Sequence, residues 1–547
     1  MVIKMNLIKN MLIFRPPKNN DDFVLKNPEN KTAYDVRKKN IPDEKDYVTG
    51  EIKKDLAYIK NRFKYPINND VVIREITLKG NRSAFLFFYE GMVDTQEVNN
   101  NIIKPLLEIP YMCDEDIYKS DDEIIKRFIS HSQATPADEM DKICEEVNFG
   151  ACCLFVDGLK NGFIIDVRKW GTRGIDKPQN EQSIYGPQEA FAEMLRTNTI
   201  LVRKIIKTEK LIAEGVKIGN VSKTRGVVLY IEGVANPNLI KEVQKRIKSI
   251  DIDYIMSSEE VGMLLEENSF SMTSQIMYTE RPDRVARALT EGRVVLMLNG
   301  SPHALIFPTT AFEMMRAVSD DYLRVPYANM SRMIRLIALF FSILLPGIYL
   351  SVILFHHEMI PTYLLYSISA TRENVPFPSV VELLLMDISF EMIREAGLRM
   401  PNPIGSTLGI VGGLILGQSA VSARIVSPLM IIVIASTGIG SFATPDYSLS
   451  WTSRVLRVCF IALGALLGLY GIAIGIVLYS LFLAAQNSFG VPFLSPSLKV
   501  GSRSMSNALV ETPIWKHELR PGYLKTGKRR VEGKISRNWK MKSRNKR

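Results

Sequence analysis

The sequence predicts a multidomain protein in which a cytoplasmic α/β region of two related subdomains is followed by an α-helical polytopic membrane domain. Two observations predict this fold class. Residues 333–498 contain four long charge-free runs, and a hydrocarbon layer needs about 20 apolar residues for each crossing helix. The preceding region contains strand-like runs and helices that recur with one spacing. We expect the membrane crossings at 336–355, 404–423, 425–443 and 458–485.

Three further segments complete the expected domain organisation. A polar lead-in occupies residues 1–70, and we expect it to be partly ordered because apolar residues are sparse there. The first α/β subdomain, with a helical linker, is expected at 71–225 and the second at 226–325. A basic cytoplasmic tail is expected at 499–547.

Two landmarks in the α/β region recur with the same offset of 142 positions. Glu90 before a glycine is matched by Glu232 before a glycine, and Asp157 is matched in the same way by Asn299. The Asp-Gly and Asn-Gly steps are typical of hairpin turns, because glycine accepts the positive φ that these turns need. One offset shared by two landmarks predicts an internal duplication.

A helix at 380–399 places charges inside the apolar part of the chain. Its candidate functional residues are Asp387, Glu391, Arg394, Glu395 and Arg399. With 3.6 residues per turn, Asp387, Glu391 and Arg394 fall on one narrow strip of the helix, and Glu395 lies beside that strip. Both glutamates can pair with the arginine three or four residues later. Ionised groups among membrane helices usually face a bundle interior or a water path. With four crossings assigned to the charge-free runs, we expect this helix to be re-entrant or interfacial.

Glycines recur at helical spacing in two of the expected crossings. Such stripes allow helix backbones to approach closely in lipid. The glycines expected to pack in this way are Gly405, Gly409, Gly413, Gly417, Gly464, Gly468, Gly471 and Gly475.

The basic excess of the chain lies in its tail, where fifteen Lys or Arg residues face three Glu. Basic residues beside a crossing mark the cytoplasmic side, so we expect both termini in the cytoplasm and an even number of crossings, namely four. Five helices with altered ends are the alternative. A basic segment beside a membrane can lie on anionic lipid, and we expect lipid rather than nucleic acid as its partner. Arg454 and Arg457 fall on the outer side in this arrangement, which fits the rule poorly.

Motifs for catalysis are absent from the sequence. It contains no P-loop pattern, no nucleophile elbow and no dinucleotide-binding glycine pattern after a strand. The five histidines are scattered, and the cysteines have no metal-ligand spacing. We therefore expect no enzyme activity, no cofactor and no metal.

Several motifs together resemble the A subunit of GerA-type spore germinant receptors. They are Tyr278-Thr279-Glu280-Arg281-Pro282-Asp283-Arg284, Pro376-Phe377-Pro378 with Glu382, Glu391-x-x-Arg394-Glu395-Ala396, Arg399-x-Pro401, Ile410-Val411-Gly412-Gly413-x-x-x-Gly417 and Ser488-Phe489-Gly490-Val491-Pro492. The resemblance runs from about residue 71 to 500. It implies a multi-pass protein of the spore inner membrane. It also implies two partners, a permease-like B subunit that holds the nutrient and a C-subunit lipoprotein, and assembly into a homo-oligomeric, nutrient-gated ion channel.

Two functional hypotheses follow. In the first, the chain is an ion-conducting subunit, because rings of charged side chains commonly line pores, and the charged strip lies near the path or its gate. The charges can equally be ion pairs that only fix helix packing. In the second, the chain is a non-conducting scaffold or signal relay. A related spore protein that amplifies ion release during germination is a further alternative within the resemblance, whereas a secondary transporter is disfavoured because no inverted repeat is detectable.

Overall fold

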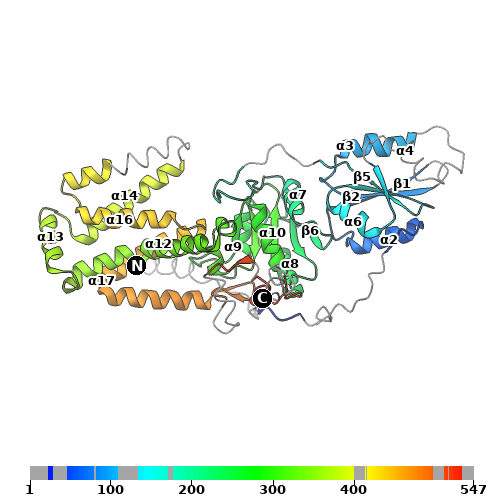
Figure 1. Ribbon diagram of the computed structural model, residues 1–547. Coiled ribbons are helices and arrows are strands. Elements are labelled where there is room, and N and C mark those ends of the chain that lie inside the picture. Colours follow the sequence, from blue (N-terminus) through cyan, green and yellow to red (C-terminus); the bar gives the residue numbers. More distant parts are fainter. Residues whose placement is uncertain are drawn as a thin grey trace, which may run out of the picture.

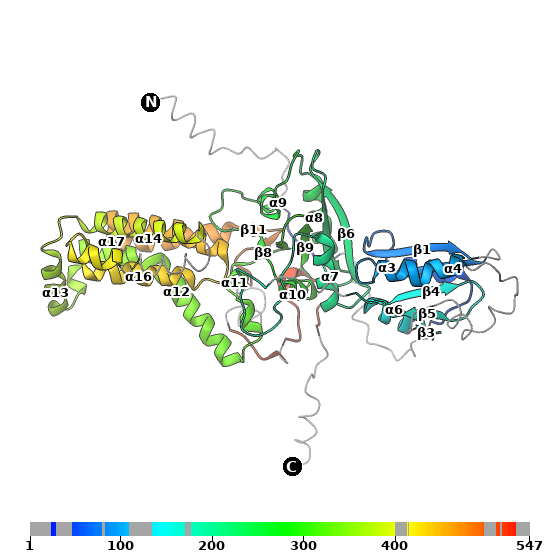
Figure 2. The same cartoon turned by 90° about the horizontal axis from the view of Figure 1, so that it is seen from above.

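The computed structural model describes residues 23–28, 46–78, 82–108, 134–169, 177–399, 413, 415–496, 510–514 and 517–531. Three parts follow one another along an elongated molecule: one α/β subdomain, a second α/β subdomain and a bundle of long helices (Figure 1). The view from above places the second subdomain between the other two (Figure 2). Among the described residues, the second subdomain is the half of the α/β region that meets the helical bundle.

The first subdomain is a five-stranded antiparallel sheet in the order β1-β2-β4-β5-β3. Its strands are β1 (Val71–Thr77), β2 (Ser83–Tyr89), β3 (Ala134–Ala137), β4 (Cys152–Val156) and β5 (Gly162–Ile165). Its helices are α2 (Ile52–Arg62), α3 (Thr95–Glu97), the π-helical η1 (Val98–Ile103), α4 (Lys104–Glu108) and α6 (Met140–Asn148).

Alternating side chains of β2 fill two separate cores, because successive residues of a strand point to opposite faces. Leu86 and Phe88 pack with η1 and α4 on one face, while Phe85 and Phe87 pack with α2 and α6 on the other. Both faces of the sheet are thus covered by helices. This explains why β2 reads as a continuous apolar run rather than as a polar–apolar alternation.

The second subdomain repeats this plan with strand order β6-β7-β9-β10-β8. Its strands are β6 (Leu211–Ile218), β7 (Thr224–Ile231), β8 (Met277–Thr279), β9 (Val294–Leu298) and β10 (Ala304–Phe307). Its helices are α7 (Leu195–Ile205), α8 (Pro237–Lys248), α9 (Ser258–Leu265) and α10 (Pro282–Glu291). Strand for strand, the order matches that of the first sheet, as a duplication requires.

The domain boundary expected at 225/226 differs from the structure. β6 lies before that boundary, yet it pairs along its length with β7 and so belongs to the second sheet. The sequence obscures this strand because Glu214, Gly215 and Lys217 interrupt its apolar pattern, and those residues lie where the strand is only half-buried.

The helical bundle begins after two short helices, α11 (Ala311–Met314) and the 3-10 helix η3 (Val318–Asp321). Its helices are α12 (Val325–Phe355), the 3-10 helix η4 (His357–Met359), α13 (Thr362–Arg372), α14 (Ser379–Arg399), α16 (Pro428–Phe442) and α17 (Tyr447–Ala485). α12 packs against α16 and α17, and α14 packs against α16. Among the described residues, α12 and α17 are long and apolar enough to cross a membrane.

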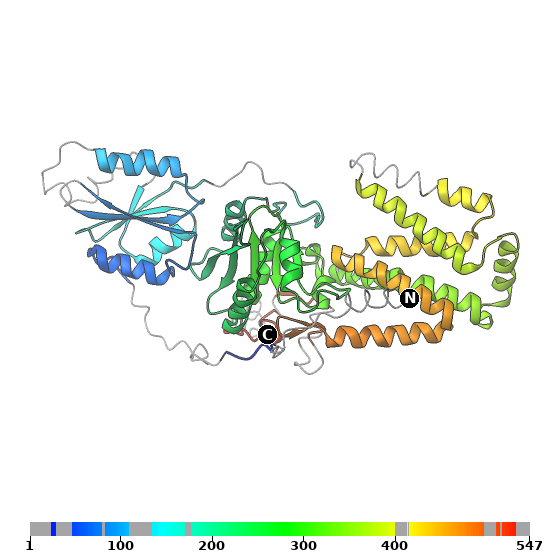
Figure 3. The same cartoon turned by 180° about the vertical axis from the view of Figure 1, so that it is seen from behind.

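α17 is a helical hairpin rather than one straight helix. Gly468 has non-helical dihedral angles (φ 61°, ψ −146°), and beyond it the chain reverses, so that a Cβ at Gly475 would lie 2.7 Å from the ring of Phe460. Both ends of α17 contact the same segment of the second subdomain, because Thr452 donates to the carbonyl oxygen of Met272 and Gln486 bonds Ser271. The view from behind shows the two arms meeting at the end of the bundle that lies away from the second subdomain (Figure 3).

This reversal changes the expected helix at 458–485. The sequence predicts one span there, whereas the structure has two arms, 447–467 and 469–485, on either side of Gly468. A straight helix of 39 residues would be about 58 Å long at 1.5 Å per residue, roughly twice the thickness of a hydrocarbon core. The hairpin brings each arm close to the length that one crossing needs.

The described residues after α17 contact the second subdomain. The hairpin of β11 (Asn487–Ser488) and β12 (Val491–Pro492) places Phe489 and Val491 in the core beneath α8 and α9. Further on, the 3-10 helix η6 (Gly522–Leu524) seats Tyr523 against the same core, and Asn236 donates to the carbonyl oxygen of Lys525 at 3.0 Å. The described part of the tail is therefore a structural strap on the α/β region.

Candidate functional site

The charged strip of α14 meets two arginines that arrive from α17. Arg457 is 1% exposed, and its Nε lies 3.2 Å from Oδ1 of Asp387. The same guanidinium bonds Glu391, which also binds Arg394 of its own helix. Arg454, one turn earlier on α17, approaches Glu391 at 3.9 Å. We call these five residues, Asp387, Glu391, Arg394, Arg454 and Arg457, the acid–arginine cluster.

The burial pattern of α14 explains why the cluster forms. Its buried positions recur at steps of three and four residues, the period of one helix face. They are Ser379, Glu382, Leu383, Met386, Asp387 and Arg394. Apolar side chains of this stripe join the core shared with α12 and α16, so the charged ones are carried into the bundle interior with them.

α14 lies lengthwise along α16 and runs in the same direction. Near its start, Glu382 accepts the backbone N–H of Ser427, the residue that precedes α16. Near its end, Arg394 donates to the hydroxyl of Ser441 at 3.0 Å. The buried Glu382 carboxylate thereby sits at the positive end of the α16 dipole, where a negative charge is stabilised.

The sequence-predicted site residues divide into two groups. Asp387, Glu391 and Arg394 come together in the buried cluster, as a shared strip predicts. Glu395 and Arg399 instead form their own pair at 2.9 Å, with side chains 51% and 80% exposed. The Glu391–Arg394 and Glu395–Arg399 spacings both produce ion pairs, but only the first is enclosed.

Sequence reasoning missed Arg454 and Arg457 as members of the site, and placed them on the outer side. In the structure they lie on the arm that contacts the α/β region through Thr452. A signal was present, because two arginines three residues apart share one helix face immediately before an apolar run. The i, i+4 rule applies within one helix, so it could not name their partners on α14.

The predicted packing glycines fall in different surroundings. A Cβ at Gly464 would lie 2.5 Å from the carbonyl oxygen of Gly347 on α12, and one at Gly471 would strike the carbonyl of Leu463 across the α17 hairpin. By contrast, a Cβ at Gly413 meets no atom of the described residues within 4 Å, and one at Gly417 makes an ordinary contact with Ile431. Gly405 and Gly409 lie outside the described residues.

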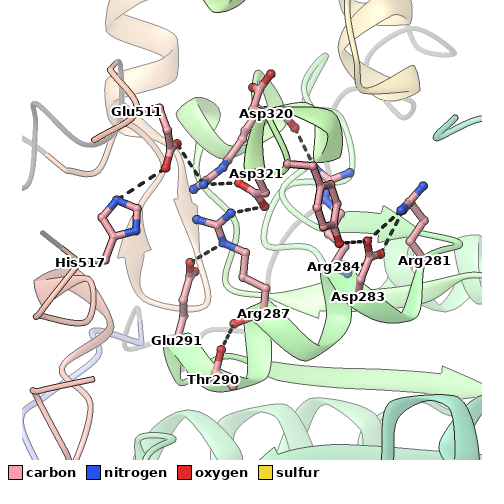
Figure 4. Close-up of polar contacts among 12 residues, drawn as sticks. Arg281, Asp283, Arg284, Arg287, Thr290, Glu291, Asp320, Asp321, Glu511 and His517 are labelled. Carbon is pink, nitrogen blue, oxygen red and sulfur yellow. Dashed lines mark hydrogen bonds and ion pairs between the residues drawn. The ribbon is translucent and has the colours of Figure 1, made fainter. Parts of the chain in front are cut away.

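A second polar network joins the α/β region to the first bundle helix (Figure 4). Asp320 of η3 is fully buried and binds Arg332 (3.0 Å) and Arg335 of α12. Beside it, Asp321 binds Arg287 of α10. Burial opposes ionisation of Asp321, but the neighbouring Arg287 and Arg316 outweigh it and hold the pKa of Asp321 below its usual value.

The tail strap contacts the same junction between the α/β region and α12. Glu511 binds Arg332 and Arg316 (3.1 Å), and its backbone N–H donates to the side chain of Asn329 at 2.6 Å. Nearby, the ion pairs surround a cavity of about 40 Å³ whose charged lining residues are Arg284, Arg287, Glu291, Arg293, Glu313, Arg316 and Asp321. Because these side chains pair with one another, the network suits transmission of force rather than binding of a large ligand.

The hairpin of α17 has its own attachments to the second subdomain. Its two ends reach the segment 271–273, where Tyr479 also lies 3.3 Å from the hydroxyl of Thr273. Ser488, just beyond α17, donates to the carbonyl of Gln275 and accepts the N–H of Thr309. Movement of the second subdomain would therefore reach α12 and α17 together, and with them the acid–arginine cluster.

No group of three or more His, Cys, Asp or Glu residues suited to hold a metal ion occurs in the part of the chain that the structure describes. The fold and the cluster define a protein with a tandem α/β region and an apolar helical bundle that encloses ion pairs. Among the described residues, two helices of this bundle are long and apolar enough to cross a membrane. Comparison with known proteins identifies its family. Residues 57–523 match the family described as Bacillus/Clostridium GerA spore germination protein, and the chain belongs to that family.

The relatives agree with this assignment. The chain is 37% identical over 458 residues to spore germination protein KA of Bacillus subtilis, covering 83% of each chain. It is 35% identical over 446 residues to spore germination protein A1 of the same organism, covering 82% of this chain and 91% of that one. It also matches the crystal structure of the N-terminal domain of the A subunit of the Bacillus megaterium spore germinant receptor GerK3, at 28% identity and a TM-score of 0.37, covering 48% of this chain and 96% of that one.

Proposed function

We propose that this chain is the A subunit of a spore nutrient-germinant receptor and oligomerises into a nutrient-gated ion channel of the spore inner membrane. The proposed partners are a permease-like B subunit, which holds the nutrient, and a lipoprotein C subunit. Membership of the GerA family supports the role in germination. The observation that carries the gating proposal is the buried acid–arginine cluster, whose helices are attached to the α/β region at both ends of the α17 hairpin.

The proposed topology has six crossings. They are α12, α14, α16 and the two arms of α17, together with the run 404–423 expected from the sequence, which lies partly outside the described residues. Both termini are placed in the cytoplasm. The sequence predicts four crossings because it treats 458–485 as one span and α14 as re-entrant or interfacial. Six is also even, so the cytoplasmic placement of both ends is retained, and Arg454 and Arg457 move to the half of the bundle nearer the cytoplasm, as the distribution of basic residues favours.

Gating follows from the electrostatics of the cluster. Charges buried among helices are stable only while paired, and removal of one partner costs roughly 3–5 kcal/mol. A shift of α17 relative to α14 would exchange the partners of Glu391, which already contacts arginines on both helices. The cluster is therefore suited to two discrete arrangements, one closed and one open, biased by the α/β region.

Ion flux tests this proposal. Liposomes that hold the purified receptor complex should release trapped ions on addition of the nutrient, and Glu391→Gln should change the release while the complex still assembles. Glu395→Gln is the matched control, because Glu395 is on the same helix but exposed. Unchanged release by Glu391→Gln at normal protein levels would contradict a role in the path or gate.

The second candidate is a non-conducting scaffold that relays a signal to a partner. The junction network of Asp320, Arg332 and Glu511 favours it, because a relay needs a rigid link between the α/β region and α12. Flux that persists when this subunit is left out of the complex would support the scaffold. The related protein that amplifies ion release remains the alternative within the family, and no enzyme activity is proposed for either role.

A further inference from the structure

The acid–arginine cluster carries one positive charge too many. Three arginines, Arg394, Arg454 and Arg457, face two carboxylates, Asp387 and Glu391, among the described residues. In water an excess charge is screened, but within a helical bundle it needs a partner. This inference rests on the proposed placement of the bundle in a membrane.

The excess falls on Arg454. Asp387 and Glu391 bind Arg457, and Glu391 also binds Arg394. Arg454 reaches Glu391 only at 3.9 Å, which is too long for a hydrogen bond. Its Nε is buried and, like the Nε atoms of Arg394 and Arg457, makes no hydrogen bond in the described part of the chain. Arg394 and Arg457 each bond Glu391 through another nitrogen, whereas Arg454 has only this long contact there, and an unpaired buried donor is unfavourable.

The position of Arg454 indicates where a partner can come from. Its guanidinium lies 4.2 Å from the ring centre of Trp451, which packs edge-on against Tyr447. Both aromatic rings are exposed, Trp451 by 45% and Tyr447 by 57%. They occupy the first turns of α17, at the end that contacts the α/β region, and exposed Trp and Tyr at a helix end are typical of the membrane–water interface.

We propose that Arg454, together with Trp451 and Tyr447, binds the phosphate of an acidic lipid head group in the leaflet that faces the α/β region. A guanidinium presents several N–H donors to phosphate oxygens, and basic pockets between helices on the cytoplasmic side bind anionic head groups. The phosphate supplies the missing negative charge and an acceptor for Arg454. A lipid is favoured over a free ion because the flanking rings are exposed where acyl chains begin.

The test compares lipid compositions with the full-length protein. Wild type and variants are placed in nanodiscs of phosphatidylcholine with or without phosphatidylglycerol, and bound lipid is counted by native mass spectrometry while unfolding temperature is measured in parallel. Wild type should retain phosphatidylglycerol and unfold at a higher temperature with it. Arg454→Gln should lose most of both effects, and Arg454→Lys should keep part of them because it retains the charge without the planar donor set.

A matched control and a second source of phosphate make the result specific. Arg324→Gln removes an exposed arginine at the start of α12 and should behave as wild type. Inorganic phosphate added to phosphatidylcholine nanodiscs should not reproduce the stabilisation. If it does, and Arg454→Gln abolishes it, the same site takes free phosphate and the lipid assignment is wrong.

Two outcomes overturn the proposal entirely. In the first, the Arg454→Gln variant retains as much phosphatidylglycerol as wild type does. In the second, the Arg454→Gln variant weakens association between copies of the protein without changing the bound lipid. The negative partner of Arg454 would then be an acidic group of a second copy. Either result can occur while wild-type ion flux is normal, so failure of the lipid site is distinguishable from failure of the proposed channel.

Discussion

Arg457 on α17 lies with its Nε 3.2 Å from Oδ1 of Asp387 on α14, and both side chains are buried. The two residues lie on different helices with α16 between them in the sequence, and their contact joins α14 to α17. Asp387→Asn should destabilise the protein by about 3–5 kcal/mol, because it leaves a buried guanidinium short of a partner. Chemical unfolding of the detergent-solubilised protein measures the loss.

The double variant Asp387→Asn/Arg457→Gln makes this prediction specific. Without a charge on either side, neither partner is stranded, so the double variant should lose clearly less stability than the sum of the two single changes. Strict additivity would show that the two side chains do not interact in solution. Val455→Ala, on the exposed face of the same arm, should cost little and serves as the control.

The acid–arginine cluster shows which part of the site can be predicted from the sequence. The strip of Asp387, Glu391 and Arg394 follows from helix periodicity alone, because that period is a property of one segment. Glu391 and Arg457 are 66 positions apart in the sequence. Their pairing depends on how α14 and α17 pack against each other, which no local rule contains. The same limit hid the α17 hairpin, since glycine at 468 permits a reversal without requiring one.

The α/β region could be predicted further than the bundle. Strand, turn and helix are local features, so two landmarks with equal offsets indicate two copies of one topology. The exception was β6, whose assignment to the second sheet depends on its pairing with β7 rather than on its own composition. The strap at 510–531 could not be foreseen either, because its fit depends on the surface that receives Tyr523.

Gly464 should be essential where α12 meets α17. A Cβ there would lie 2.5 Å from the carbonyl oxygen of Gly347, so Gly464→Ala must separate the two helices. Overpacking of this kind costs roughly 1–3 kcal/mol. Gly413→Ala is the control, because the added Cβ meets no atom of the described part of the chain within 4 Å. Equal unfolding temperatures for the two variants would show that the helices are not in close contact.

His303 should give the second subdomain a pH-dependent stability. Its Nδ1 lies 2.9 Å from Glu259. The hydrogen bond to Glu259 raises the pKa of His303 above its ordinary value of 6.5, and the same bond lowers the pKa of Glu259 to about 2. The histidine contribution is therefore complete below pH 6.5 and is lost as the pH rises through the raised pKa of His303. The carboxylate contribution is complete above pH 4.5 and is lost as the pH falls toward about 2.

His303→Gln isolates this contribution. The difference in unfolding midpoint between wild type and His303→Gln should be largest between about pH 4.5 and 6.5, set by the ordinary pKa values of the two groups, and should shrink on either side. A difference that does not change with pH would contradict an ion pair. Because both side chains are partly exposed, raised salt concentration should also reduce the difference.

Asp320 should couple the α/β region to α12. Its carboxylate is buried and binds both Arg332 and Arg335, so Asp320→Asn should destabilise the junction by about 3–5 kcal/mol. Hydrogen exchange should then increase at the start of α12 and in η3. Asp253→Asn changes an exposed carboxylate of the same subdomain and should leave exchange unchanged. Protection that is equal in the two variants would exclude Asp320 from the link.

The tail strap should stabilise the second subdomain through its described part rather than through its basic end. A chain that stops after Val531 keeps the contacts of Glu511, Tyr523 and Lys525 and should unfold at the wild-type temperature. A chain that stops after Pro496 loses them, exposing the core around Tyr523 and leaving Arg293 without the hydroxyl that it now bonds at 3.0 Å. Burial of one large aromatic side chain contributes about 1.5–3 kcal/mol, so the shorter chain should be less stable by at least that amount. Equal stability of the two truncations would show that the strap is not held on the subdomain in solution.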